Sequence, residues 1–198
     1  MDLKTKKILI TGDSFAADWT KKYNGVGWVN MLENVCDVTN IAQAGASEYK
    51  IHKQLQSVNV NDYDYVIVSH TSAYRIPVKE HPIHWDDILH KECDLIYSDL
   101  KCHDYNDLVK IGIDFFENLF DPDYFVFIHK LILDKINLNY PNIINITFFD
   151  SFNECDNMIY LEEVFLENKG LINHLNDNGN QIVYEKIINT INEGWIHN

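Results

Sequence analysis

Residues Lys7–Phe15, which read KILITGDSF, decide the fold of this chain. The run Lys7–Thr11 predicts a short buried strand, because consecutive apolar and β-branched residues suit a strand that is covered on both faces. Gly12 permits a tight turn where that strand ends, and Ser14 follows inside the turn. The stretch therefore predicts a buried strand whose carboxyl end presents a serine.

The rest of the chain alternates between strand-like and helix-like segments. Further strands are predicted at residues 37–41, 65–69 and 142–149, and helices at residues 27–35, 47–58, 105–120, 121–138 and 178–191. Ser47 and Asp121 are expected to cap two of these helices, and Pro122 suits a first helical turn. Strands separated by helices predict an α/β fold, in which a parallel sheet of about four to five strands carries helices on both faces.

Composition excludes several classes of protein. The 198 residues suit one domain, residues 1–198, and the 30 acidic against 16 basic side chains give a net charge of −14. That charge repels phosphate backbones and anionic membranes, and the sequence holds no basic patch, so neither nucleic acid nor membrane is an expected partner. The chain has neither an apolar run of about 20 residues nor a signal-peptide core. Its four cysteines form no CxxC pair, so reduced thiols and a cytoplasmic location are expected.

The stretch 76–104 is predicted to be an irregular insertion with one short helix around Trp85–Lys91. It holds Pro77 and Pro82 and gathers residue types that bind zinc, namely His81, His84, Asp86, Asp87, His90, Cys93, Cys102 and His103. Their spacing fits no known zinc finger, so we expect no metal. A lid or wall that shapes access to a site is the expected role of this segment.

The carboxyl ends of the predicted strands are where functional residues of such sheets gather. A backbone N–H beside Ser14 can face the same space as its hydroxyl, which is half of a nucleophile and oxyanion arrangement, although such a turn is often only a turn. The small residues of Ala42–Ser47 allow either a ligand or a helix to approach the backbone closely. His174 precedes the last predicted helix and can reach the first strand.

Together these residues resemble the GDSL, or SGNH, hydrolase superfamily. Gly12-Asp13-Ser14 matches its first block, Gly45 matches the glycine of its second block, and His174-Leu175-Asn176 followed by Gly179 matches its fifth block. The resemblance implies a flavodoxin-like three-layer sandwich. It also implies ester hydrolysis without a cofactor or metal, with Ser14 as nucleophile and His174 as base.

Two positions depart from the pattern of that superfamily. The third block commonly supplies an Asn whose amide donates to the oxyanion, and here Ser72 stands in its place. The oxyanion hole is therefore expected to combine the backbone N–H groups of Ser14 and Gly45 with the Ser72 hydroxyl. The fifth block commonly has an Asp three residues before the histidine, and here that residue is Leu171.

The missing acid leaves several alternatives open. The protein can use a Ser-His dyad, Asp150 or Asp177 can orient the imidazole, or activity can have been lost. Asn173 is able to hold the loop, although it carries no charge. Asp13 is a candidate substrate contact.

Two residues after the third strand are further candidates for substrate contact. Arg75 is suited to a carboxylate or phosphate of a substrate, or to an ion pair within the protein. His70 is either a packed histidine that donates to a backbone carbonyl or a substrate contact.

Three functions remain open from the sequence. The first is an esterase that acts on a small-molecule or carbohydrate ester, with O-acetyl groups as the expected small target. The second is a binding protein that keeps the fold and not the reaction. The third is an acyltransferase with the same nucleophile. Neither the substrate nor the oligomeric state follows from the sequence.

Overall fold

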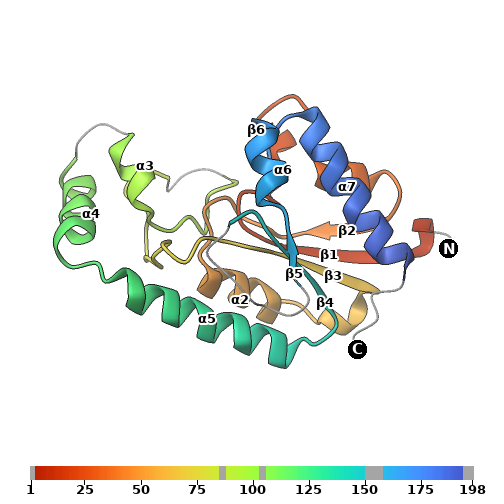
Figure 1. The fold of residues 1–198 in the computed structure, drawn as a ribbon, viewed down its shortest axis with the longest axis horizontal. Coiled ribbons are helices and arrows are strands. Elements are labelled where there is room, and N and C mark those ends of the chain that lie inside the picture. Colours follow the sequence, from red (N-terminus) through yellow and green to blue (C-terminus); the bar gives the residue numbers. More distant parts are fainter. Residues whose placement is uncertain (1–2, 85–87, 103–105, 150–157, 194–198) are drawn as a thin grey trace.

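The computed structural model describes residues 3–84, 88–102, 106–149 and 158–193, and it contains a five-stranded sheet (Figure 1). The strands are β1 (Lys7–Gly12), β2 (Asp37–Asn40), β3 (Tyr65–His70), β4 (Ile143–Thr147) and β5 (Met158–Tyr160). They lie in the order β2-β1-β3-β4-β5, and every neighbouring pair is parallel. This order is that of a flavodoxin-like doubly wound sheet, so the predicted fold class is confirmed.

The helices follow most of the predicted segments. They are α1 (Trp28–Glu33), α2 (Glu48–Gln56), α3 (Tyr97–Lys101), α4 (Asp107–Asn118), α5 (Pro122–Asn139), α6 (Glu162–Glu167) and α7 (Asp177–Asn192), with short 3-10 turns at Leu3–Thr5, Trp19–Lys21 and Val60–Asp62. Ser47 caps α2 by accepting from the Lys50 N–H, and Asp121 caps α5, as the sequence predicts.

The two faces of the sheet are covered by different helices, because strand side chains alternate in direction. Ile8 and Ile10 of β1 belong to a core that includes Trp28 and Leu32 of α1 and Val183 and Ile187 of α7. Leu9 points to the opposite core, which includes Ile51 and Leu55 of α2 and Ile136 of α5. Figure 1 shows the result, with α2 and α5 on one side of the sheet and α6 and α7 on the other.

The insertion differs from its prediction. Ile88–Lys91, the described part of the helix expected at residues 85–91, forms turns, and the remainder lies outside the described residues. A helix forms later, at α3, which packs against α4 beyond the carboxyl ends of the strands (Figure 1). The sequence analysis also missed β5, α6 and the short strand β6 (Lys169–Ile172).

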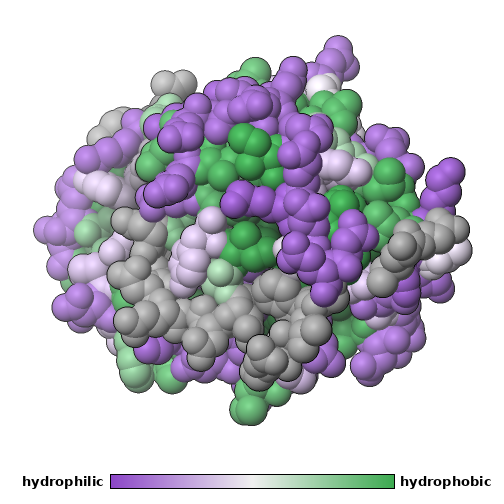
Figure 2. All heavy atoms as spheres, turned by 45° about the vertical axis from the view of Figure 1, so that its right-hand side comes forward, coloured by the Kyte–Doolittle hydropathy of each residue, from purple (hydrophilic) through white to green (hydrophobic). Residues whose placement is uncertain are grey.

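The surface agrees with the polar composition. On the face in Figure 2, hydrophobic residues lie in separate patches between hydrophilic ones. Among the described residues, no helix is both long and apolar enough to span a membrane.

Candidate active site

Ser14 lies in the turn that follows β1, and two interactions fix that turn. Gly12 has φ +144°, and a Cβ there would approach the Cβ of Ser69 to 2.6 Å. Only glycine therefore fits at this position of β1, beside Ser69 of the neighbouring strand β3. The Asp13 carboxylate accepts from the Phe15 N–H at 3.0 Å and from the Ser69 hydroxyl at 3.2 Å. Asp13 is 1% exposed, and its carboxylate holds the turn in shape. Its role as a substrate contact stays a prediction.

Burial has an electrostatic consequence for Asp13. It raises the pKa of this carboxyl to about 6, although the Phe15 N–H and the charge of Arg75 act to lower it. A residue beside the candidate nucleophile therefore changes its charge near neutral pH.

Two backbone donors beside Ser14 are unengaged. In the described part of the chain, no hydrogen bond uses the N–H of Ser14 or the N–H of Gly45. Gly45 is buried and has φ +73°, and an unpaired backbone N–H is uncommon in such a position. Ser14 and Gly45 follow neighbouring strands, β1 and β2, at the same edge of the sheet. Both of the backbone donors predicted for an oxyanion hole are thus available to bind a ligand.

His174 is held beside the Ser14 turn by its neighbour Asn173. The Asn173 side-chain N–H2 donates to the carbonyl of Phe15 at 2.8 Å and to that of Ala17 at 3.0 Å. Asn173 and His174 have φ values of 50° and 59°, a left-handed pair that non-glycine residues seldom adopt. Such strain is found at functional sites and persists only where the surroundings enforce it. The predicted loop-holding role of Asn173 is confirmed.

The fifth-block residues after His174 build the start of α7. Asn176 caps this helix by accepting from the Gly179 N–H at 2.9 Å. A Cβ at Gly179 would come within 2.7 Å of the Asn168 Cβ, so this position requires glycine. Asn180 donates to the carbonyls of Ile172, Leu175 and Asn176 and thereby fixes the loop that carries His174.

The His174 imidazole packs on two aromatic rings from the segment that follows Ser14. Its ring centroid lies 4.7 Å from that of Phe15 and 5.9 Å from that of Trp19. Burial in this apolar setting, together with the positive charge of Arg75, lowers the pKa of His174 to about 4. The imidazole is therefore neutral at pH 7. Within the described residues, no hydrogen bond joins it to Ser14.

Of the two predicted acids, Asp177 lies among the described residues. It is exposed in the first turn of α7 and makes no hydrogen bond to His174 there, so its role as the orienting acid stays a prediction. Asp150 lies outside the described residues. The carboxylate whose charge acts on His174 is Asp99 of α3, and it only partly opposes the lowering of the pKa.

The insertion is attached to the Gly45 loop through Asp94, whose side chain is fully buried. Its carboxylate accepts from the N–H groups of Ser47 at 3.1 Å and Val78 at 2.8 Å, and it pairs with Lys50 at 2.7 Å. Its own N–H donates to the Gly45 carbonyl at 2.8 Å. The predicted wall is thus in direct contact with the loop that carries a candidate oxyanion donor. Sequence reasoning missed Asp94, since one aspartate in an irregular stretch gives no signal.

Ser72 and Arg75 come from the loop that follows β3. The Ser72 hydroxyl oxygen accepts from the Tyr74 N–H at 3.3 Å, which leaves its hydrogen able to donate elsewhere. Arg75 turns toward the Gly45 loop and donates to the Asp94 carbonyl at 2.9 Å. Its positive charge lowers the pKa of both Asp13 and His174, although burial outweighs this effect at Asp13.

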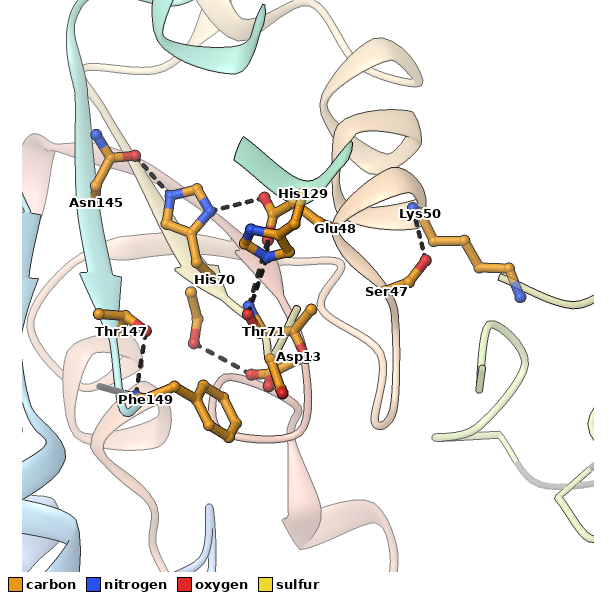
Figure 3. A network of polar contacts seen from close by, with 12 residues as sticks. Asp13, Ser47, Glu48, Lys50, His70, Thr71, His129, Asn145, Thr147 and Phe149 are labelled. Atoms are coloured by element: carbon orange, nitrogen blue, oxygen red, sulfur yellow. Dashed lines mark hydrogen bonds and ion pairs between the residues drawn. The ribbon is translucent and has the colours of Figure 1, made fainter. Parts of the chain in front are cut away.

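His70 is fully buried in a polar network, so the alternative of a substrate contact is wrong. Figure 3 shows its imidazole between Glu48, at 2.7 Å, and the Asn145 side-chain oxygen, at 2.8 Å. Both ring nitrogens face oxygen atoms, an arrangement that favours the charged imidazolium. Burial alone would lower the pKa of His70, but the Glu48 carboxylate raises it.

Glu48 joins three elements through this network. Burial opposes its ionisation, yet His70 and His129 hold the pKa of Glu48 well below its usual range. Its second oxygen lies 3.3 Å from His129 of α5 and accepts from the Thr71 N–H (Figure 3). The start of α2, the end of β3 and α5 are thereby tied together beneath the candidate site. Sequence reasoning missed Glu48, because a glutamate at a helix start is usually solvated.

The three insertion histidines among the described residues stack on one another. His81 and His84 have ring centroids 5.0 Å apart, those of His84 and His90 are 4.6 Å apart, and His90 approaches Trp19. No group of three or more potential ligands in the described residues is placed to hold a metal ion. Asp86, Asp87 and His103 lie outside those residues.

Comparison with known proteins gives one distant likeness. No family model matches the sequence, and no curated protein matches it. Among solved structures, a catalytic mutant of Axe2, an acetylxylan esterase from Geobacillus stearothermophilus, is similar at 12% sequence identity with a TM-score of 0.41. That alignment covers 100% of both chains.

Proposed function

We propose that this protein is a serine ester hydrolase with Ser14 as nucleophile and His174 as general base. The observation that carries the proposal is the pair of unengaged N–H groups, on Ser14 and Gly45, in a site where His174 packs against the residue next to Ser14. Gly45 is buried and Ser14 is partly buried, and N–H groups without a partner in such positions are suited to stabilise a developing negative charge.

In the proposed reaction, Ser14 Oγ attacks the acyl carbon while His174 takes its proton. The carbonyl oxygen becomes the oxyanion, which the N–H groups of Ser14 and Gly45 and the Ser72 hydroxyl stabilise. Collapse of this intermediate expels the alcohol, which receives the proton from His174. Water then attacks the acyl-enzyme by the same route and releases the acid and free Ser14.

The proposed substrate is a small acyl ester of a small molecule or carbohydrate, and an O-acetyl ester is the first to try. The steps need only the protein and water. Turnover is expected to be slow, because loss of an orienting carboxylate costs about 10⁴-fold in kcat in a well-studied triad. An acyltransferase would share the acyl-enzyme and pass the acyl group to an alcohol instead of water.

A binding protein without activity is the second candidate. It is favoured by the absence, in the described residues, of a hydrogen bond between Ser14 and His174. Catalytic contacts are often loose in a protein without its substrate and tighten on binding, so this observation does not decide against the hydrolase.

Hydrolysis of p-nitrophenyl acetate by wild type, Ser14→Ala and His174→Gln tests the proposal. We expect measurable turnover by wild type and its loss in both variants. Ser57→Ala is the matched control, because Ser57 lies at the far end of α2 and its hydroxyl bonds only to the Gln54 carbonyl. Equal rates for wild type and Ser14→Ala would reject the hydrolase. An acyltransferase would release more acylated alcohol than acid when glycerol is added.

A further inference from the structure

Arg75 is the single arginine of the chain, since the other basic side chains among its 16 are lysines. This one arginine is 11% exposed and lies against the candidate oxyanion loop, where its Nη1 is 3.2 Å from the position of a Gly45 Cβ. A lysine would supply the same charge but not the planar fork of donors. The chain thus places its only guanidinium at the candidate site.

The protein leaves that guanidinium underused. Nη1 donates to the Asp94 carbonyl, and the nearest carboxylate oxygen, on Asp99, is 3.8 Å from Nη1 and outside hydrogen-bond range. Nε is buried and has no partner. A buried donor without a partner destabilises the folded protein, so the unengaged Nε edge marks a place where an acceptor is missing.

We propose that Arg75 binds a carboxylate of the substrate, so that the preferred ester carries one carboxylate group. This inference rests on the proposed hydrolase and names its substrate class. The Nε and Nη2 donors of arginine lie parallel and match the two oxygens of a carboxylate.

The charge of the surroundings favours a monoanion over a phosphate. Arg75 already forms one ion pair, in which its Nη1 is 3.8 Å from the Asp99 carboxylate, and the whole chain carries a charge of −14. Because the guanidinium shares its charge with Asp99, a dianionic phosphate would bring more uncompensated negative charge to the site than a single carboxylate.

Two pairs of esters test the inference, and in each pair one member carries a free carboxylate that the other carries as a methyl ester. The first pair is mono-p-nitrophenyl glutarate and its neutral methyl ester. The second pair places the carboxylate on the alcohol side, with 4-acetoxybenzoate and methyl 4-acetoxybenzoate. Each kcat/KM is divided by the rate constant for hydroxide hydrolysis, which removes intrinsic differences in reactivity.

We expect wild type to prefer the anionic member of at least one pair by tenfold or more. Arg75→Gln should abolish that preference, so that the ratio of kcat/KM for the two members falls to about one whatever the change common to both, while Arg75→Lys should restore part of it. Lys79→Gln is the control, because it removes the same charge from an exposed position four residues away. Denaturation midpoints of all variants confirm that they are folded.

Three outcomes would overturn the inference. They are no preference in wild type, a preference that survives Arg75→Gln, and an equal loss of kcat for both members, which would place Arg75 at the oxyanion. In each case Ser14-dependent hydrolysis of the neutral ester would leave the proposed hydrolase intact.

If wild type hydrolyses neither ester, the hydrolase fails and the carboxylate site is tested by binding alone. Benzoate and benzamide are titrated against the His174 ring resonances in NMR spectra. Saturable binding of benzoate that Arg75→Gln weakens at least tenfold would support the site, and equal binding of the two probes would reject it.

Discussion

Asn173 donates one side-chain amide to the Phe15 carbonyl at 2.8 Å, and this bond joins the loop of His174 to the turn of Ser14. The same amide also donates to the Ala17 carbonyl, so one side chain of the His174 loop makes two hydrogen bonds to the segment that follows Ser14. The candidate nucleophile and base therefore depend on a residue that takes part in no chemical step.

We expect Asn173→Ala to lower kcat by about 10- to 100-fold and stability by about 1–3 kcal/mol, because buried carbonyls lose their donor. Asn173→Gly separates the amide from the backbone strain, since glycine adopts φ 50° without strain but lacks the amide. If Asn173→Gly keeps full kcat per folded molecule, the amide does not position His174. Rates and urea midpoints are measured on the same preparations.

The pH dependence of kcat/KM should report the buried state of His174. Burial and the charge of Arg75 disfavour the imidazolium, and the pKa of about 4 means that the neutral base forms as the pH rises through 4. The rise of kcat/KM with pH is therefore expected to have its midpoint near pH 4. An unsupported histidine, whose pKa is about 6.5, would place that midpoint higher. Arg75→Gln should move the midpoint upward. A wild-type midpoint above pH 6.5 would instead indicate a carboxylate partner for His174.

Asp13→Asn should stabilise the protein at alkaline pH. The folded pKa of Asp13, about 6, exceeds the ordinary value of 3.8, so the folded state holds the proton more tightly. This contribution to stability is complete below pH 3.8 and is lost as pH rises through 6, at a cost of up to about 3 kcal/mol. We expect Asp13→Asn to recover about 1–3 kcal/mol at pH 8 and nothing near pH 3.5, as measured by urea unfolding.

Ser72→Ala tests the third proposed oxyanion donor. Loss of the hydroxyl should lower kcat by about 10- to 1000-fold, because a donor aimed at the oxyanion acts only in the transition state. The lost bond from the Tyr74 N–H should cost about 1 kcal/mol of stability. A kcat within twofold of wild type would show that Ser72 only shapes the turn. The oxyanion hole would then consist of the two backbone donors.

Glu48→Gln should destabilise the protein by about 3–5 kcal/mol, because it leaves the buried His70 charge without its partner. Glu163→Gln removes the same charge from an exposed position in α6 and serves as the control. Thermal unfolding of both variants at pH 7 compares them. Equal midpoints would show that His70 is neutral in the folded protein.

The fold was predicted well where residues within a helix or strand, or at its ends, determine that element. The run before Gly12, the β-branched strand at β3 and the caps at Ser47 and Asp121 act within a few residues, and all were placed correctly. The short strand β5 was missed, because three residues give too little pattern and their pairing with β4 is a long-range interaction.

The candidate site was predictable in part for the same reason. Ser14, Gly45 and His174 stand at recognisable turns. The partners of Glu48 and Asp94, in contrast, lie well outside the local sequence: His70 is 22 residues from Glu48, and Ser47 and Val78 are 47 and 16 residues from Asp94. Charges alone gave no reason to expect these two carboxylates to be buried, since most of the 30 acidic residues were expected to be solvated.

The attachment of Asp94 to the Gly45 loop has a consequence for how this protein can diversify. A segment that determines which molecules enter would ordinarily be free to vary while the chemistry stays constant. Here a change in the insertion that displaces Asp94 also displaces Ser47 and the backbone at Gly45. For the proposed function, substrate selectivity and catalytic rate therefore both depend on the position of Asp94. Variants selected for a new substrate should keep Asp94 and change the residues around it.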